Sequence, residues 1–311
     1  MRAILVTEFG GPDALNVVEI PTPEPGPGQL RIKTAAAAIN PADVATRAGH
    51  LGQAIPDDRL PVGLGWDVAG TVDAVGLGVD GFAVGDAVTA IDDRLLKDLG
   101  TYAEYVVLDA DAAAPAPRTV DAVAASTLPL NAITAVHSLD LIDLAPDQTL
   151  LVTGAAGAVG GYLVELGAAR GLHVVALAGD ADEPATRSWG ARTFVGRSAD
   201  PAAAVRAVFP DGVDGVIDAA NLRSAILGAA REGGKYVTLT PALGAIETEA
   251  DVQVLVQMAR RDAAVLAELA RLVDAGELTL RVAETFPLDQ AAAAHELSAK
   301  GGVRGRIVLV P

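Results

Sequence analysis

The segment VTGAAGAVGG, from Val152 to Gly161, has the composition of a phosphate-binding turn. It follows an apolar run at Thr149–Thr153 and precedes a helical pattern, which is the context that a dinucleotide fingerprint requires. Small residues let the backbone approach a pyrophosphate, and the helix N-terminus attracts its charge. A glycine-rich chain can also place a plain tight turn here, but the strand–turn–helix context favours a dinucleotide. The candidate cofactor contacts are Ala155, Ala156, Gly157, Ala158, Val159 and Gly160.

The end of the following strand bears on which dinucleotide binds. An acidic residue there would hold a free ribose 2′-hydroxyl and mark NAD. The strand HVVALAGD ends in Ala178 and Gly179, and Asp180 lies beyond the usual position. We therefore expect NADPH, with Gly179 near the ribose and Arg197 beside the 2′-phosphate. Asp180 would repel that phosphate unless its side chain turns away, so NADH remains open.

Composition excludes several classes of site and partner. The 311 residues include no cysteine, which rules out thiolate metal sites and disulfides, and the four histidines lack the spacing of a zinc hydrolase. A net charge of −17 disfavours nucleic acid and anionic membranes as partners. The uncharged run over residues 122–139 contains polar residues and proline, so we interpret it as buried loop and helix. The N-terminus shows no signal-peptide pattern, which makes the cytoplasm the expected compartment.

The chain divides into two parts with different sequence patterns. Up to about residue 115 it is strand-like and rich in turns, which predicts a β-rich module. From about residue 148, apolar strands alternate with helices, which predicts a parallel sheet covered on both faces. The expected fold class is therefore α/β, with a doubly wound Rossmann domain and a β-rich domain.

The C-terminal part adds a helix and a last strand. Residues 262–275 are amphipathic, and the tail RGRIVLVP is strand-like and is expected to return to the first module. The predicted catalytic domain therefore comprises residues 1–120 together with 278–311, and the cofactor domain comprises 121–277. The alternation of Val252, Val254, Val256 and Met258 predicts a sticky sheet edge and hence a homodimer.

Several motifs in order resemble the medium-chain dehydrogenase/reductase superfamily, specifically its zinc-independent quinone oxidoreductase branch. They are AAINPADVATRAG, GWDVAGTVDAVGLGVDGFAVGDAV, GTYAEYVVLDAD, TLPLNAITAVHSL, VTGAAGAVGG, GVDGVIDAA and GRIVLV, and they cover essentially the whole chain. The resemblance implies a GroES-like catalytic domain beside the Rossmann domain. It also implies cofactor contacts at Thr134, Ala219 and Leu239, and at Lys300 in a loop before the last strand.

In the zinc-dependent relatives, a cysteine and a histidine hold the catalytic metal. This chain has Asn40 and Trp66 at those positions, and an indole has no lone pair for a metal. No metal is therefore expected, and Asp67 is expected to be a structural hydrogen-bond acceptor. Asn40 is the candidate catalytic residue, as a hydrogen-bond partner of the nicotinamide or of the substrate oxygen, although it can equally form a turn before Pro41.

The resemblance implies an NADPH-dependent oxidoreductase that transfers a hydride to a quinone or a conjugated carbonyl compound as its small-molecule substrate. The branch often carries tyrosines where this chain has Ala45 and Leu51, which puts quinone stacking in doubt, and His50 is a possible proton donor or a solvated loop residue. Two alternatives remain open: an enoyl-thioester reductase, and a nucleotide-binding sensor or structural protein without turnover.

Overall fold

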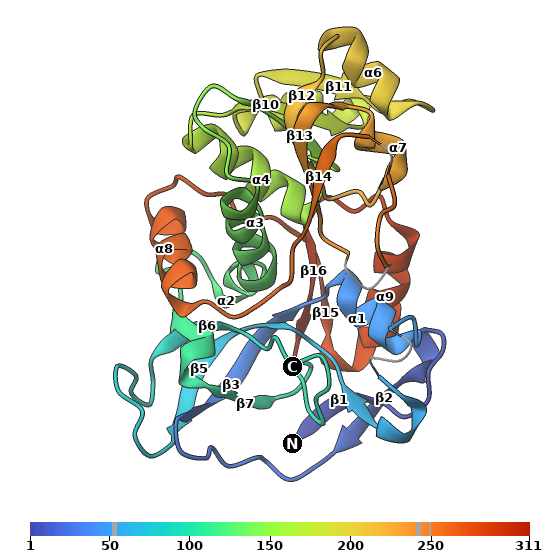
Figure 1. The fold of residues 1–311 in the computed structure, drawn as a ribbon. Coiled ribbons are helices and arrows are strands. Elements are labelled where there is room, and N and C mark those ends of the chain that lie inside the picture. Colours follow the sequence, from blue (N-terminus) through green and yellow to red (C-terminus); the bar gives the residue numbers. More distant parts are fainter. Residues whose placement is uncertain (52–54, 241–243, 249) are drawn as a thin grey trace. The chain divides into compact units, whose positions relative to one another are not determined.

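A computed structural model describes residues 1–51, 55–240, 244–248 and 250–311 (Figure 1). It divides into unit 1, Met1–Ile133 with Arg260–Pro311, and unit 2, Thr134–Ala259. These divisions differ from the predicted boundaries at 120/121 and 277/278. The reason at the second boundary is that helix α8 (Ala263–Asp274) packs on strand β8 (Ala113–Pro115) of unit 1. The first division falls inside helix α3 (Pro129–Ile142).

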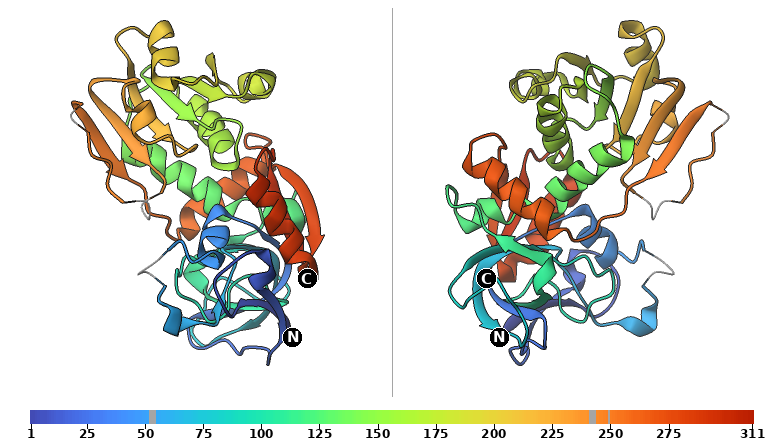
Figure 2. Two further views of the ribbon diagram at one scale, coloured as in Figure 1. Left: turned by 90° about the vertical axis from the view of Figure 1, so that its right-hand side faces the viewer. Right: turned by 60° about the vertical axis from the view of Figure 1, so that its left-hand side comes forward.

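Unit 2 contains a parallel sheet whose described strands have the order β11-β10-β9-β12-β13-β14 (Figure 2). This is the doubly wound order in which the chain reverses between the first and fourth strands, as the sequence predicted. The three central strands, β10, β9 and β12, are nearly all buried, which explains their continuous apolar runs. They are β9 (Thr149–Thr153), β10 (His173–Ala178), β11 (Thr193–Gly196), β12 (Val213–Asp218), β13 (Ala230–Thr238) and β14 (Val252–Val256).

Helices cover both faces of this sheet. On one face, α3 and α4 (Ala158–Ala169) meet it closely: Gly167 of α4 lies against Leu150 and Val174, and a side chain at Gly215 would strike Ile142 of α3. On the other face, Leu151 and Val175 share an apolar cluster with residues of α6 (Pro201–Val208) and α7 (Ser224–Leu227). The short α5 (Glu183–Ser188) follows β10. The sequence did not predict α5.

Unit 1 is β-rich, as predicted. One sheet has the order β2-β1-β4, and another has the order β15-β16-β3-β5-β6-β8, with β7 pairing to β3. The strands are β1 (Arg2–Val6), β2 (Leu15–Glu19), β3 (Gln29–Ala38), β4 (Val62–Gly63), β5 (Asp67–Val75), β6 (Ala87–Ile91), β7 (Tyr105–Asp109), β15 (Val282–Pro287) and β16 (Arg306–Val310). Its other helices are α1 (Pro41–Arg47), α2 (Ala122–Ala125) and α9 (Ala291–Lys300).

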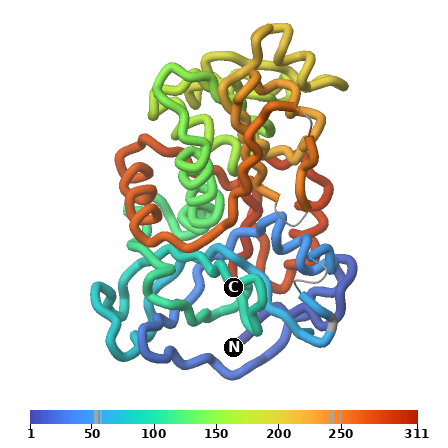
Figure 3. Tube along the Cα trace, viewed as in Figure 1, coloured from blue at the N-terminus to red at the C-terminus, as the bar shows by residue number. Residues whose placement is uncertain are grey.

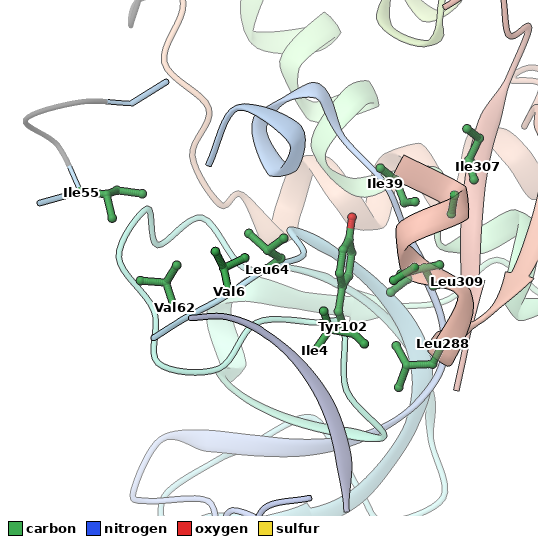
Figure 4. Close-up of a cluster of buried hydrophobic side chains, with 13 residues drawn as sticks. Ile4, Val6, Ile39, Ile55, Val62, Leu64, Tyr102, Leu288, Ile307 and Leu309 are labelled. Atoms are coloured by element: carbon green, nitrogen blue, oxygen red, sulfur yellow. The ribbon is translucent and has the colours of Figure 1, made fainter. Parts of the chain in front are cut away.

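The terminal strand returns to unit 1, which confirms the prediction for the tail. In β16, Val308 and Leu309 pair antiparallel with Ala38 and Ala37 of β3, so the red C-terminal segment lies beside the blue N-terminal one within this unit (Figure 3). The core beside it joins β1, β16 and α9, with the Tyr102 ring between aliphatic side chains (Figure 4). Among the described residues, no helix is long and apolar enough to cross a membrane.

Candidate functional site

The glycine turn between β9 and α4 is held closed by backbone contacts. Gly154 has a φ of 59°, a left-handed conformation that favours glycine. A Cβ at Gly160 would overlap the carbonyl oxygen of Gly154 and lie 2.8 Å from the Cα of Ala155. A Cβ at Gly157 would stand 3.0 Å from the Gly154 oxygen. The small residues of this turn are therefore required by its own packing.

The turn leaves hydrogen-bond donors for a phosphate. Gly157 is the N-cap residue of α4 and has no side chain to satisfy the first N–H groups of the helix. Ala156, Gly157, Ala158 and Val159 are half-buried, whereas Ala155 and Gly160 are buried beneath them. The donor set fits a dinucleotide pyrophosphate, which binds to helix N-termini through backbone N–H groups. Unit 2 is thus a nicotinamide-cofactor type of Rossmann fold.

The ends of β10 and β11 carry charges of opposite sign. Gly179 follows β10, and the exposed Asp180 is the next residue. A Cβ at Gly196 would overlap the Asp180 carboxylate, so that carboxylate lies against the end of β11. Arg197 follows β11, is exposed, and donates its backbone N–H to the Ala178 carbonyl at 2.9 Å. The structure therefore places near each other the two groups that the sequence analysis expected to act on the cofactor in opposite ways, Asp180 and Arg197.

Behind the turn lies a buried carboxylate that the sequence reasoning missed. Asp218, at the end of β12, accepts hydrogen bonds from the Thr153 hydroxyl at 2.5 Å and the Tyr236 hydroxyl at 2.7 Å. The Thr153 hydroxyl in turn accepts the N–H of Ala220 at 3.0 Å. This network ties the ends of β9, β12 and β13 together. An acid ending an apolar strand, as in GVIDAA, was the signal that could have found it.

The remaining predicted cofactor residues lie in different places. Ala219 and Leu239 follow β12 and β13 at the carboxyl end of the sheet and are half-buried. Thr134 is buried within α3. The predicted loop position of Lys300 is wrong, because Lys300 is the exposed last residue of α9 in unit 1. The helix extends through an alanine-rich segment with high helical propensity.

Asn40 stands in a buried polar cluster of unit 1. Its side-chain nitrogen donates to the Asp67 carboxylate at 2.9 Å, and its side-chain oxygen accepts from the amide of Asn131 at 3.2 Å. Asp67 also accepts the backbone N–H of Leu130 at 2.7 Å. Asn40 is only 1% exposed, and its amide is engaged on both sides. Asp67 is thus a structural acceptor, as predicted, whereas the catalytic role of Asn40 stays a prediction.

A cation from the returning strand balances Asp67. The Arg306 guanidinium lies 3.7 Å from the carboxylate and also donates to the Ile39 carbonyl. Burial raises the pKa of Asp67 to about 6, while Arg306 and the hydrogen bonds from Asn40 and Leu130 act in the opposite direction. Asp67 and Arg306 are both almost fully buried, so each charge depends on the other.

Asp43 joins this cluster to the neighbouring segment. Its carboxylate accepts the backbone N–H groups of Asn40 at 2.8 Å and of Gly65 at 2.7 Å, and it also contacts the Tyr102 hydroxyl. Burial raises its pKa above the ordinary value. Asp43 therefore fixes Asn40 relative to Trp66, which follows Gly65. The sequence reasoning gave Asp43 no role, although the Asn-Pro-x-Asp spacing places it at the third helical position, where acids accept the N-cap N–H.

Asn40 and Trp66, at the positions where the zinc-dependent relatives have metal ligands, are poorly suited to bind a metal. The amide of Asn40 is occupied, and the indole of Trp66 offers no lone pair. In the described ranges, no group of three or more histidine, aspartate or glutamate residues is placed to hold a metal ion. His50 is exposed in the turn after α1. The absence of a catalytic metal and a proton-donating role for His50 both stay predictions.

Two family models match the chain. The alcohol dehydrogenase GroES-like domain matches residues 26–118, and the zinc-binding dehydrogenase model matches residues 189–309. Unit 1 thus contains the GroES-like fold, and the chain as a whole has the two-part architecture expected from the sequence.

Curated proteins and solved structures match over the full length. A chloroplast envelope quinone oxidoreductase homolog of Arabidopsis thaliana is 28% identical over all of this chain and 98% of its own. An NAD-dependent alcohol dehydrogenase of Saccharolobus solfataricus is 30% identical over 100% of both. A mycobacterial protein solved with NADPH aligns with a TM-score of 0.86 at 28% identity, covering both chains completely. The chain therefore belongs to the medium-chain dehydrogenase/reductase superfamily of oxidoreductases.

Proposed function

We propose that this oxidoreductase uses NADPH to reduce a quinone or a conjugated carbonyl compound. The observation that carries the proposal is the glycine turn, whose backbone N–H groups fit a dinucleotide pyrophosphate. When bound, the nicotinamide would supply the hydride. Relatives named as quinone oxidoreductases support this class of acceptor.

In this proposal, the protein binds and orients rather than supplying a metal. Asn40 and Trp66 replace metal-binding side chains, and the Asn40 amide is held by Asp67 and Asn131. The buried network keeps the segments around Asn40 and Asp67 rigid, which favours a fixed geometry for hydride transfer.

An acceptor panel tests the reaction. Purified protein is mixed with NADPH and with naphthoquinones, benzoquinones, open-chain enones and an enoyl thioester, and absorbance at 340 nm is followed. We expect turnover with quinones or enones. Faster turnover of the enoyl thioester than of both other classes would replace the proposed substrate, and no turnover with any acceptor would favour a sensor.

The cofactor preference is tested by removing one cation. Arg197 has no hydrogen bond or ion pair to a side chain within the described residues and is available to a 2′-phosphate. Charge-assisted contacts contribute about 1.5 to 3 kcal/mol, so Arg197→Ala should weaken NADPH binding by about tenfold or more and leave NADH binding nearly unchanged. Fluorescence titration measures both.

Arg192→Ala is the matched control, because Arg192 is also exposed but lies before β11, at the opposite end of that strand. It should leave both affinities unchanged. A wild-type protein that prefers NADH, or an Arg197→Ala variant with an unchanged affinity ratio, would show that Asp180 recognises a ribose hydroxyl instead.

We also propose a homodimer formed through β14. This strand is the last in the described sheet order, and Val256 and Met258 beside it are 49% and 61% exposed. Val252 and Val254 pack on the core of unit 2, so the exposed apolar surface is narrower than the sequence suggested. Light scattering at micromolar concentration should give twice the chain mass, and Val256→Glu should give the monomer. A monomeric wild type would contradict the proposal.

A further inference from the structure

A buried ammonium group faces the tryptophan that replaces the metal-binding histidine. The Lys97 nitrogen lies 4.7 Å from the centre of the Trp66 ring. It donates hydrogen bonds to the carbonyl oxygens of Gly65 and Asp92, each at 2.9 Å. Lys97 is 5% exposed and Trp66 is 9% exposed, so this cation–aromatic contact is largely shielded from water. Shielding strengthens such contacts.

The residue before Trp66 is held from both sides. The N–H of Gly65 donates to the Asp43 carboxylate at 2.7 Å, and its carbonyl accepts from Lys97. Gly65 has a φ of 101°, and a Cβ there would overlap the Thr101 hydroxyl, so only glycine fits this conformation. The backbone entering Trp66 is therefore fixed, and Lys97 fixes the indole as well.

Two carboxylates, Asp92 and Asp43, act on the Lys97 ammonium, and each also has partners of its own. The Asp92 carboxylate lies 3.5 Å from the ammonium but is already paired through both oxygens with Arg94, at 2.8 Å each. Asp43 is the other acidic group that acts on Lys97. Asp43 is itself satisfied by two backbone N–H groups. The ammonium thus forms an ion pair with the Asp92 carboxylate, which Arg94 also holds, in addition to its contacts with the two carbonyl oxygens and the Trp66 ring.

We propose that Lys97 is a positioning residue that holds the Trp66 ring as a rigid wall of the acceptor site, and that this wall favours flat, conjugated ring acceptors over open-chain ones. The substrate part rests on the proposed function. Trp66 immediately precedes Asp67, which holds Asn40, so the ring stands next to the predicted reaction centre in the chain. Lys97 fixes the side chain that stands where related zinc enzymes bind their metal. The exposed part of the indole would also provide a stacking surface where this chain has Ala45 and Leu51.

The test isolates one tryptophan. The chain has two, so Trp189→Phe leaves Trp66 as the only indole emitter. In this background, Lys97→Met removes the charge and the donors but keeps an unbranched stem. Lys97→Arg retains the cation. Lys33→Met is the matched control, because Lys33 is exposed on β3. Each protein is measured for acrylamide quenching of Trp66 and for equilibrium binding of 1,4-naphthoquinone and an open-chain enone.

We expect Lys97→Met to increase acrylamide quenching and to weaken naphthoquinone binding on the order of tenfold, with enone binding changed by less than about twofold. In turnover assays, the same change should appear in KM for the quinone rather than in kcat. Lys97→Arg should restore most of the wild-type behaviour, and Lys33→Met should match the wild type.

Unchanged acrylamide quenching of Trp66 in Lys97→Met would contradict the positioning role. An equal loss of affinity for naphthoquinone and for the enone would contradict the proposed preference for ring acceptors. If Lys97→Met does not fold, Trp66→Leu tests the wall alone, and equal binding of both ligands by Trp66→Leu and wild type contradicts it. A wild type that binds naphthoquinone but reduces no acceptor would disprove the proposed function while leaving the role of Lys97 supported.

Discussion

The glycine turn of unit 2 and the polar cluster of unit 1 are built in opposite ways. The turn consists of backbone groups from one continuous segment, and side chains are excluded at Gly160 because they would collide with Gly154. The cluster consists of side chains from distant segments: Asn40, Asp67, Asn131 and Arg306. The turn should therefore tolerate loss of side-chain atoms but not their addition, and the cluster should show the reverse.

The largest expected effect is truncation within the cluster. Asp67→Ala leaves the buried Arg306 without its carboxylate, and breaking such a pair costs about 3 to 5 kcal/mol. Chemical denaturation measures the loss in unfolding free energy. The double variant Asp67→Ala with Arg306→Met should lose less than the sum of the two single changes, because no unpaired charge remains. Additive losses would show that the two charges do not depend on each other.

The second effect is an addition within the turn. Gly160→Ala places a methyl group against the backbone of Gly154 and Ala155, and overpacking of this kind costs about 1 to 3 kcal/mol. Cofactor affinity, measured by fluorescence titration, should fall as well. Gly228→Ala in the same unit is the control, because its Cβ would meet only Ala202 at an ordinary 3.5 Å. Equal effects of the two changes would contradict a turn closed by backbone packing.

Acid provides a third way to probe unit 1. Burial, together with Arg47, lowers the pKa of His295 from 6.5 to about 3. His295 is therefore protonated near pH 6.5 in the unfolded chain but only near pH 3 in the folded chain. The free energy of unfolding falls as the pH falls between these two values. From pH 7 to pH 5, the loss from this group is about 2 kcal/mol.

The variant His295→Gln isolates that contribution. Unfolding free energies of wild type and variant are compared at both pH values, since other groups contribute equally to each protein. The variant should lose about 2 kcal/mol less than the wild type between pH 7 and pH 5. Parallel pH profiles would mean that His295 does not stay neutral in the fold.

The smallest expected effect is a truncation in the turn. Val159 is half-buried, and its backbone, not its side chain, is the predicted contact with the cofactor. Val159→Ala should therefore change cofactor affinity by less than about twofold and stability by less than about 1 kcal/mol. Fluorescence titration and denaturation measure these. A tenfold loss of affinity would show that the side chain, rather than the backbone, shapes the turn.

The glycine turn and the polar cluster also differ in how much of each could be predicted from the sequence. The turn, the strands around it and the parallel sheet could be predicted because their signals are local: spacing of small residues, apolar runs and strand–helix alternation. The pairing of the terminal strand could also be predicted, because the tail is strand-like and the cofactor sheet was already complete. The ion pair between Arg306 of this strand and Asp67 could not be predicted.

What escaped prediction depends on contacts between distant residues. Lys97 lies in an irregular segment, and no pattern in the sequence around it indicates that its ammonium contacts the Trp66 ring. Asp218 needs Thr153 and Tyr236, which lie on other strands, before its role is visible. Lys300 was placed in a loop because the family resemblance implied one there, whereas α9 of this chain extends to Lys300. Side-chain partnerships of this kind arise only from the tertiary fold.

The return of β16 to β3 bears on the order in which the chain acquires structure during synthesis. A ribosome releases the Asn40 and Asp67 segments well before Arg306. All of unit 2 is translated in between, and it has its own sheet and core. The inserted unit can therefore fold while the nascent chain is still attached, but the buried carboxylate of the surrounding unit must wait for its counter-charge. Synthesis that stops before residue 306 would leave Asp67 unneutralised.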